Sequence, residues 1–128
     1  MVPVASGRRT RVVLGGHDDA PRLGAAELGR APGERATLVQ FSTAFCRPCA
    51  ATRRVLADVA AMVPGVAHVD LDAESRLPLV RALDIRSTPT VLVLDATGRV
   101  VRRAAGLPRR ADVIAALGEA VQPQADDR

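Results

Sequence analysis

Residues 37–49 read Thr37-Leu38-Val39-Gln40-Phe41-Ser42-Thr43-Ala44-Phe45-Cys46-Arg47-Pro48-Cys49. The apolar run over 37–42 predicts a buried strand, and the apolar spacing over 50–63 predicts a helix. Cys46 and Cys49 are the only cysteines of the chain, and they stand between these two elements. A C-x-x-C pair where a strand turns into a helix is typical of a dithiol/disulfide redox site.

The position of the pair predicts different roles for the two cysteines. The attacking sulfur in disulfide exchange is a thiolate, and the first turn of a helix stabilises an anion through its unpaired N–H groups and its dipole. Arg47 adds a positive charge beside the first sulfur, and Pro48 suits a first turn, where a missing N–H costs little. We therefore predict that Cys46 is the nucleophile and Cys49 the resolving residue.

Two other interpretations of the pair stay open. A structural disulfide between Cys46 and Cys49 would close a very short loop, so it would stabilise the fold less than a long-range bridge. A zinc site could combine the two cysteines with His17 and His68. The two histidines lie on opposite sides of the cysteines, without the usual ligand spacing, and we therefore expect no metal.

The charge of the chain does not indicate a nucleic-acid-binding protein. The net charge is +4, and all 18 basic residues are arginine. They are spread in singles and pairs from Arg8 to Arg128, without a long basic run. The only two aromatic residues are Phe41 and Phe45, so the chain offers no series of rings on which bases could stack. We expect no nucleic-acid partner.

Nothing in the sequence predicts a membrane span or a leader. No stretch of about 18 apolar residues is present, and residues 1–9 lack an apolar core of signal-peptide length. The protein is therefore expected to be cytoplasmic. In that compartment cysteines stay reduced, so a reactive pair fits better than a structural bridge. A membrane anchor upstream of this sequence stays open as an alternative.

The other apolar patterns predict strands and helices in alternation. They are a strand over 11–14, a short helix over 24–28, a strand over 66–71, a helix over 76–83, a hairpin of strands over 90–94 and 99–104, and a helix over 109–121. One domain is expected over 10–121, between tails over 1–9 and 122–128. Strands separated by helices, then a hairpin and a closing helix, predict an α/β sandwich around a mixed sheet.

The spacing within the two longest helices predicts which of their side chains face the core. In the helix over 50–63, the inward residues are expected to be Ala51, Val55, Val59 and Met62. In the helix over 109–121, they are expected to be Val113, Ile114, Leu117 and Val121.

On several motifs taken together, the chain resembles the thioredoxin family over about residues 35–121. The motifs are Phe41 to Cys49, the strand Val69-Asp70-Leu71-Asp72, the segment Ile85-Arg86-Ser87-Thr88-Pro89-Thr90-Val91-Leu92, and glycines at 98 and 106. The resemblance implies a thioredoxin-like sandwich, in which helices flank a central mixed β-sheet, and a redox pair formed by Cys46 and Cys49. It also implies a cis bond between Thr88 and Pro89, close to the cysteines.

The resemblance further implies a function, which is the reduction of protein disulfides in cellular redox homeostasis. The docking surface for disulfide-containing protein substrates would consist of Phe45, Arg47, Pro48, Thr88 and Pro89. The redox-active disulfide would serve without any other cofactor, a flavoprotein reductase that uses NADPH would supply electrons, and the protein would be a monomer.

Several positions depart from the family pattern. Gln40 stands where the family commonly buries an aspartate, and it cannot take over the role of that aspartate in deprotonating the second cysteine. His68 stands where the family commonly has a lysine. It either acts as a base through water or is a core histidine with a satisfied hydrogen bond, and we favour the second. Phe45 and Ser42 replace two tryptophans.

Two further hypotheses about function stay open. The first keeps the fold and reverses the redox poise, so that Arg47 makes the protein a more oxidising electron relay for exported proteins. The second is a non-catalytic binding module that uses the thioredoxin surface and merely retains its thiols.

Overall fold

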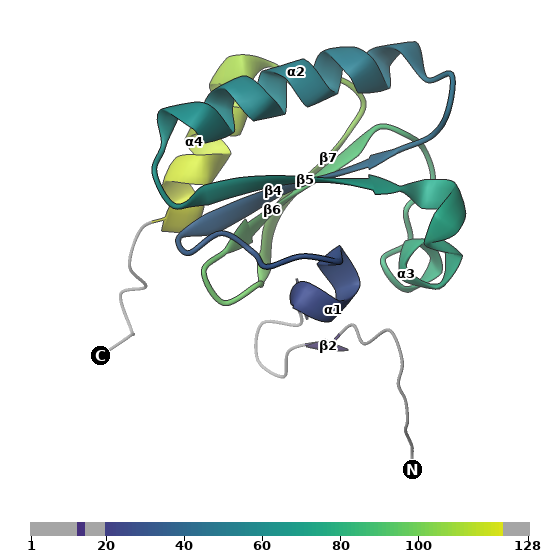
Figure 1. The fold of residues 1–128 in the computed structure, drawn as a ribbon, viewed down its shortest axis with the longest axis horizontal. Helices are drawn as coiled ribbons and strands as arrows, with labels where there is room; N and C mark the ends of the chain where they lie inside the picture. Colours follow the sequence, from purple (N-terminus) through teal and green to yellow (C-terminus); the bar gives the residue numbers. More distant parts are fainter. Residues whose placement is uncertain (1–12, 15–19, 122–128) are drawn as a thin grey trace.

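The computed structural model describes residues 13–14 and 20–121 of the chain (Figure 1). The predicted tails over 1–9 and 122–128 lie outside the described residues, as do residue 10 and the first half of the strand predicted over 11–14. The second half of that strand is β2 (Val13–Leu14), which pairs antiparallel with β3 (Pro21–Arg22).

A four-stranded mixed sheet forms the centre of the protein, as predicted. Its strands lie in the order β5 (Val66–Asp72), β4 (Ala36–Ser42), β6 (Thr90–Asp95) and β7 (Val100–Ala105). β4 runs parallel to β5, whereas the pairs β4–β6 and β6–β7 are antiparallel. All seven residues of β4 are buried, because this strand has a neighbour on each side and helices over each face.

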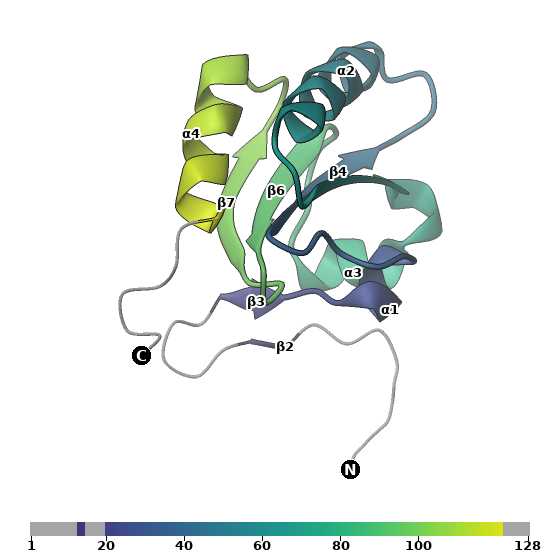
Figure 2. The ribbon, with the colours of Figure 1, turned by 60° about the vertical axis from the view of Figure 1, so that its left-hand side comes forward.

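Helices cover both faces of the sheet (Figures 1 and 2). One face carries α2 (Arg47–Met62) and α4 (Arg110–Val121), which pack against each other. The opposite face carries α1 (Ala25–Leu28), the 3-10 turn η1 (Ala73–Ser75) and α3 (Leu77–Ala82). The thioredoxin-like sandwich that the sequence predicts is therefore confirmed. None of the helices in the described part of the chain has the length and apolar character needed to cross a bilayer.

Each face of the sheet has its own apolar cluster. The cluster beneath α2 and α4 includes Leu38, Leu56, Val91 and Leu117. The cluster on the opposite face is built around Phe41 and is completed by leucines from α1 and α3. The two clusters follow from the alternation of side chains along β4, because neighbouring residues of a strand point to opposite faces.

The predicted inward face of α2 is partly wrong. Val59 is buried as expected, and Ala51 and Val55 are half-buried, with Val55 packed against the cluster beneath α2 and α4. The buried residues of α2 are Cys49, Thr52, Leu56 and Val59, whereas the side chain of Met62 is 58% exposed. The helix begins at Arg47, three residues before the predicted start, and the burial of Cys49 sets the rotation of the helix about its axis. Alanines stand all around this helix, so its sequence carries only a weak signal for the buried face.

The predicted inward face of α4 is partly wrong for a related reason. Val113 and Leu117 are buried as expected, but Ile114 is 42% exposed. The other buried positions belong to Ala116 and Ala120. Small side chains on this face let the helix lie close to the sheet, and the larger isoleucine is left at the edge of the contact.

The β6–β7 turn is held by the carboxylate of Asp95. Its Oδ1 accepts hydrogen bonds from the backbone N–H of Thr97 at 2.9 Å, the hydroxyl of Thr97 at 2.7 Å and the backbone N–H of Arg99 at 3.0 Å. Burial by itself would raise the pKa of Asp95, but these hydrogen bonds and the charge of Arg99 outweigh burial and lower it. Gly98, which follows Thr97 in this turn, has a φ of +88°. Its carbonyl oxygen accepts a hydrogen bond from the N–H of Leu23 at 2.9 Å.

We predict that Gly98→Ala destabilises the protein by about 1–3 kcal/mol. A β-carbon at this position would meet the backbone of Leu23, and an L-residue rarely adopts its positive φ. Gly118→Ala is the matched control, because a β-carbon there meets nothing within 4 Å and lies in a helix, where alanine gains about 0.5–1 kcal/mol over glycine. Urea unfolding of the oxidised variants measures both. Equal stability of the two variants would contradict the packing of Leu23 on this turn.

Candidate dithiol site

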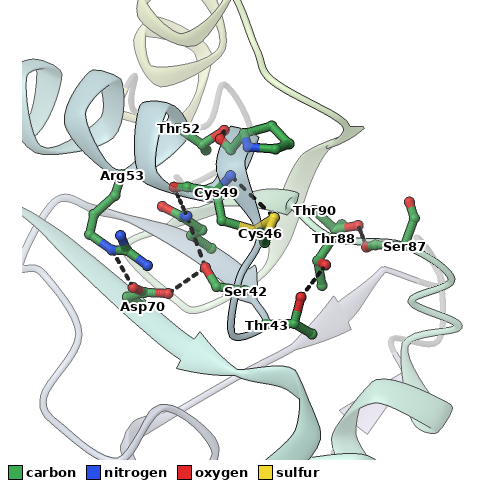
Figure 3. The surroundings of a disulfide bond; sticks show 12 residues. Ser42, Thr43, Cys46, Cys49, Thr52, Arg53, Asp70, Ser87, Thr88 and Thr90 are labelled. Carbon is green, nitrogen blue, oxygen red and sulfur yellow. Dashed lines mark hydrogen bonds and ion pairs between the residues drawn. A yellow bond between two sulfur atoms is a disulfide. The ribbon is translucent and has the colours of Figure 1, made fainter.

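Cys46 and Cys49 form a disulfide at the point where β4 leads into α2 (Figure 3). Their Cα atoms are 5.2 Å apart, within the usual range for a disulfide. Cys46 is the N-cap of α2, and Cys49 lies in the first turn, where Pro48 also stands as expected. The short spacing and the helix start thus bring the two sulfurs together, as the sequence predicts.

The two sulfurs differ in their access to solvent. Cys46 is half-buried, whereas Cys49 is only 1% exposed. The backbone N–H of Cys49 donates a hydrogen bond of 3.2 Å to Sγ of Cys46. In the reduced protein, the same N–H group and the positive end of the α2 dipole would stabilise a thiolate on Cys46. A partner that approaches the site therefore reaches Cys46 first.

The loop before Cys46 presents an aromatic ring to solvent. Phe45 has a φ of +63°, a left-handed conformation that is uncommon for a bulky residue, and its side chain is fully exposed. Residues in such conformations cluster at functional sites. Arg47 and Pro48 follow the ring and are exposed as well. Three of the five predicted docking residues thus lie together on the surface around Cys46.

The other two docking residues, Thr88 and Pro89, lie in the loop that precedes β6. The bond between them is cis, which confirms the prediction from the resemblance. The hydroxyl groups of Thr43 and Thr88 are hydrogen-bonded at 2.9 Å, which ties this loop to the loop before the cysteines (Figure 3). The carbonyl oxygen of Pro89 accepts a hydrogen bond from the N–H of Gly106 at 2.8 Å. Pro89 itself is buried, so only the backbone and Thr88 border the surface.

A chain of hydrogen bonds runs beneath the disulfide from the core to the surface. Gln40 is fully buried, and its Nε2 donates to the carbonyl oxygen of Cys49 at 2.8 Å and to Oγ of Ser42 at 2.9 Å. The hydroxyl of Ser42 donates to Oδ1 of Asp70 at 2.8 Å. Oδ2 of Asp70 accepts a charge-assisted hydrogen bond from Nε of Arg53 at 2.7 Å. Figure 3 shows the outer part of this chain, from Ser42 to Arg53.

His68 lies at the inner end of the same chain. It is half-buried, and its Nε2 is 3.4 Å from Oε1 of Gln40. Burial lowers the pKa of His68; Asp70 opposes this effect, and Arg53 and Arg30 add to it. These features agree with the favoured hypothesis of a core histidine that has a hydrogen-bond partner.

Several of these contacts had no signal in the sequence. Arg53 and Asp70 are 17 positions apart, and Thr43 and Thr88 are 45 apart. The alternation of β5 does place Asp70 and His68 on the same side of the strand, as expected. Only the packing of α2 over this side brings Arg53 to Asp70. Among the residues that the structure describes, no three His, Cys, Asp or Glu side chains come together as metal ligands.

Comparison with known proteins agrees with this geometry. Residues 25–122 match the family model of the thioredoxin-like domain. No curated protein matches the chain significantly by sequence.

Several solved structures share the fold. A mutant thioredoxin from Halobacterium salinarum superposes with a TM-score of 0.63 at 19% identity, over 71% of this chain and 79% of that one. Spinach chloroplast thioredoxin f gives a TM-score of 0.60 at 25% identity, over 69% and 78% of the two chains. Mitochondrial thioredoxin 3 from Saccharomyces cerevisiae, in its oxidised form, gives 0.59 at 15% identity, over 67% and 79%.

The lowered pKa of His68 predicts a loss of stability in mild acid. The unfolded chain, with a histidine pKa of about 6.5, binds more protons than the folded protein at pH values between the two pKa values. The free energy of unfolding should therefore be highest above about pH 6.5 and decrease as the pH falls through this window. The effect is modest, because His68 is partly exposed and solvent screens its charge.

Urea unfolding between pH 7.5 and 5 measures this effect. His68→Gln should remove the decrease, because a glutamine keeps a hydrogen-bond donor and does not titrate in this range. His17→Gln, at the other histidine of the chain, is the control and should leave the decrease in place. A decrease that persists in His68→Gln would contradict the assignment.

Proposed function

The chain belongs to the thioredoxin family, and on that premise we propose that it reduces protein disulfides through Cys46 and Cys49. Its fold and its close cysteine pair are those of a thiol–disulfide oxidoreductase. The observation that carries the proposal is the difference between the two sulfurs. Cys46 caps the helix and is accessible, as a nucleophile requires, whereas Cys49 is buried directly behind it.

The reaction follows from this arrangement. The thiolate of Cys46 attacks one sulfur of the substrate disulfide, whose S–S bond breaks, and the leaving thiolate takes a proton from water. The sulfur of Cys49 then attacks Sγ of Cys46 as its thiol loses a proton, and the second substrate sulfur leaves as a thiolate, which takes up a proton. Two electrons have then passed to the substrate, and the Cys46–Cys49 disulfide remains. A flavoprotein reductase that uses NADPH would return the pair to its reduced form in the cytoplasm.

The exposed residues around Cys46 support a docking role. The ring of Phe45 offers apolar contact area, and Arg47 forms no ion pair with any described residue. The backbone of Thr88 stands at the border of the site, where an extended substrate segment could pair with it. Pro48 and Pro89 would shape the two sides of this surface.

Two features favour the more oxidising relay as a second candidate. The buried side chain that contacts the Cys49 turn is a neutral amide, and Arg47 adds a positive charge at the helix start. Arg47 favours a thiolate on Cys46, and the amide, unlike a carboxylate, does not oppose one; a stabilised reduced form makes the disulfide a stronger oxidant.

Reduction of insulin disulfides with a dithiol as electron donor tests the proposal, because a non-catalytic binding module would not accelerate it. The equilibrium of the cysteine pair with glutathione then decides between a reductant and an oxidant.

We predict that Cys49→Ser accumulates a mixed disulfide with its substrate. Cys46 can still attack in this variant, but no second thiol is present to release the product. Cys46→Ser is the control and should form no such adduct, because the remaining sulfur is buried. Non-reducing gel electrophoresis and mass spectrometry detect the adduct. An adduct that forms equally well through Cys49 would reverse the assigned roles.

We also predict that Arg47→Ala lowers the thiolate fraction of Cys46 in the reduced protein. A cation beside the sulfur favours the anion, so alkylation by iodoacetamide should slow by about twofold to fivefold near neutral pH. The effect should shrink in concentrated salt, because Arg47 is exposed. Arg54→Ala removes an exposed arginine about two turns further along α2 and is the matched control. Equal effects of the two substitutions would mean that the net charge, not Arg47, governs the sulfur.

A further inference from the structure

The floor of the dithiol site is a neutral polar side chain with every hydrogen-bonding group in use. Gln40 is fully buried on β4, and its amide is the polar group that contacts the carbonyl oxygen of Cys49. Both amide hydrogens are donated, one to Cys49 and one to Ser42, and Oε1 faces His68. A buried polar group with all its partners in place is held rigidly.

Only one orientation of this amide fits its surroundings. The carbonyl oxygen of Cys49 can only accept, so Nε2 of Gln40 must face it. A flipped amide would bring two oxygens together at 2.8 Å, the distance that now separates Nε2 from the carbonyl oxygen. With Nε2 so placed, Oε1 faces Nε2 of His68 at 3.4 Å, and it accepts a hydrogen bond in the tautomer that carries its proton on that nitrogen.

The donor and acceptor roles are also determined for the hydrogen bonds between Gln40 and the surface. Because the hydroxyl of Ser42 donates to Asp70, its oxygen lone pairs are available to Gln40. Asp70 is in turn neutralised by Arg53, at a distance of 2.7 Å. Both partners of this ion pair are partly exposed, and they line a hollow of about 320 Å³ together with Ser42, Thr43, Ala44 and Asp72. The chain therefore begins at the turn of Cys49 and ends at a charged pair in contact with solvent.

We propose that Gln40 is a positioning residue for Cys49, and that the Asp70–Arg53 pair is the outer electrostatic end of the same chain. The proposal rests on the function proposed above, since it concerns the cysteine that resolves the mixed disulfide. Gln40 holds the Cys49 turn in place without putting a charge next to the dithiol. The charged residues of this hydrogen-bond chain, Asp70 and Arg53, lie at the surface, where their charges cancel.

This arrangement has a chemical consequence for the reduced site. A carboxylate in contact with the Cys49 turn would disfavour a thiolate on either sulfur, whereas the amide does not. With an amide in that contact, Gln40 cannot take the proton that Cys49 loses when it attacks Sγ of Cys46. The surface pair acts at longer range, with Asp70 disfavouring thiolates and Arg53 favouring them.

Two variants test the effect of charge on the cysteine pair, and they should shift its dithiol–disulfide equilibrium in opposite directions. Gln40→Glu keeps the shape of the side chain but adds a group that ionises. In glutathione buffers at pH 8, the dithiol–disulfide equilibrium should shift toward the disulfide by about tenfold. This shift corresponds to a rise of about one unit in the pKa of the thiol. The shift should disappear near pH 5, where both thiols are protonated and no thiolate is present for the new carboxyl to repel. Asp70→Asn leaves Arg53 uncompensated and should shift the pair about twofold to threefold toward the dithiol, less in concentrated salt.

Asp58→Asn is the matched control for the loss of an ion pair. It breaks the contact of Asp58 with Arg110, at 3.1 Å, which also joins α2 to another element but lies outside the hydrogen-bond chain. Its redox equilibrium should equal that of the unmodified protein. If the network only stiffened the structure, both test variants would shift the dithiol–disulfide equilibrium in the same direction and at every pH. That result would overturn the electrostatic part of the proposal.

Positioning is tested with Gln40→Met, which is neutral and of similar length but cannot donate. The protein is first loaded with glutathione on Cys46, and the release of glutathione by Cys49 is followed in a single turnover. Release should slow by about tenfold, while the pH dependence of the glutathione equilibrium stays unchanged. Release at the original rate would overturn the positioning role.

None of these measurements uses a protein substrate, so they separate the two proposals. If insulin is not reduced but Gln40→Glu and Asp70→Asn shift the pair in opposite directions, the proposed function fails and the role of Gln40 stands. If insulin is reduced and the variants equal the unmodified protein, the function stands and the role of Gln40 fails. Should Gln40→Glu not fold, Asp70→Asn at the surface still decides the electrostatic part by its direction.

Discussion

The hydrogen bond from the backbone N–H of Cys49 to Sγ of Cys46 is the interaction on which the site depends. It makes a cysteine the N-cap of α2, and it joins the start of the helix to the sulfur that meets the substrate. The same geometry turns Cys49 into the core, where it is almost completely buried. One local interaction thus defines the first turn of the helix and makes the two sulfurs chemically different.

The sheet supplies the rigid support for this turn. β4 is buried along its whole length between two apolar clusters, so the loop that follows it starts from a fixed position. The loop before β6 reaches the same place because β6 pairs with β4, and the Thr43–Thr88 hydrogen bond joins the two loops. Residues 45 positions apart therefore border one surface, and the sheet determines their spacing.

Charge in this protein is kept away from the buried side of the dithiol. The amide of Gln40 fills the polar position under Cys49, and Asp70 and Arg53 pair at the surface. Burying an isolated carboxylate is costly, whereas a fully hydrogen-bonded amide can be buried with little penalty. The floor of the site is therefore stable in itself and neutral toward the sulfurs, while Arg47 adds a positive charge on the exposed side.

The sequence by itself determined the elements and the cysteine pair, because both depend on neighbours along the chain. Strand alternation, the apolar run before Cys46 and the turn at Gly98 are local patterns, and the motif around Pro89 was recognisable by resemblance. Tertiary structure decided which faces of α2 and α4 are buried, since alanines on several sides of each helix leave the apolar periodicity weak. Met62 and Ile114, predicted to face the core, are exposed for this reason. It also decided the contacts of Gln40, Ser42, Asp70 and Arg53. These side chains come from three elements, and only packing across the sheet sets the distances between them.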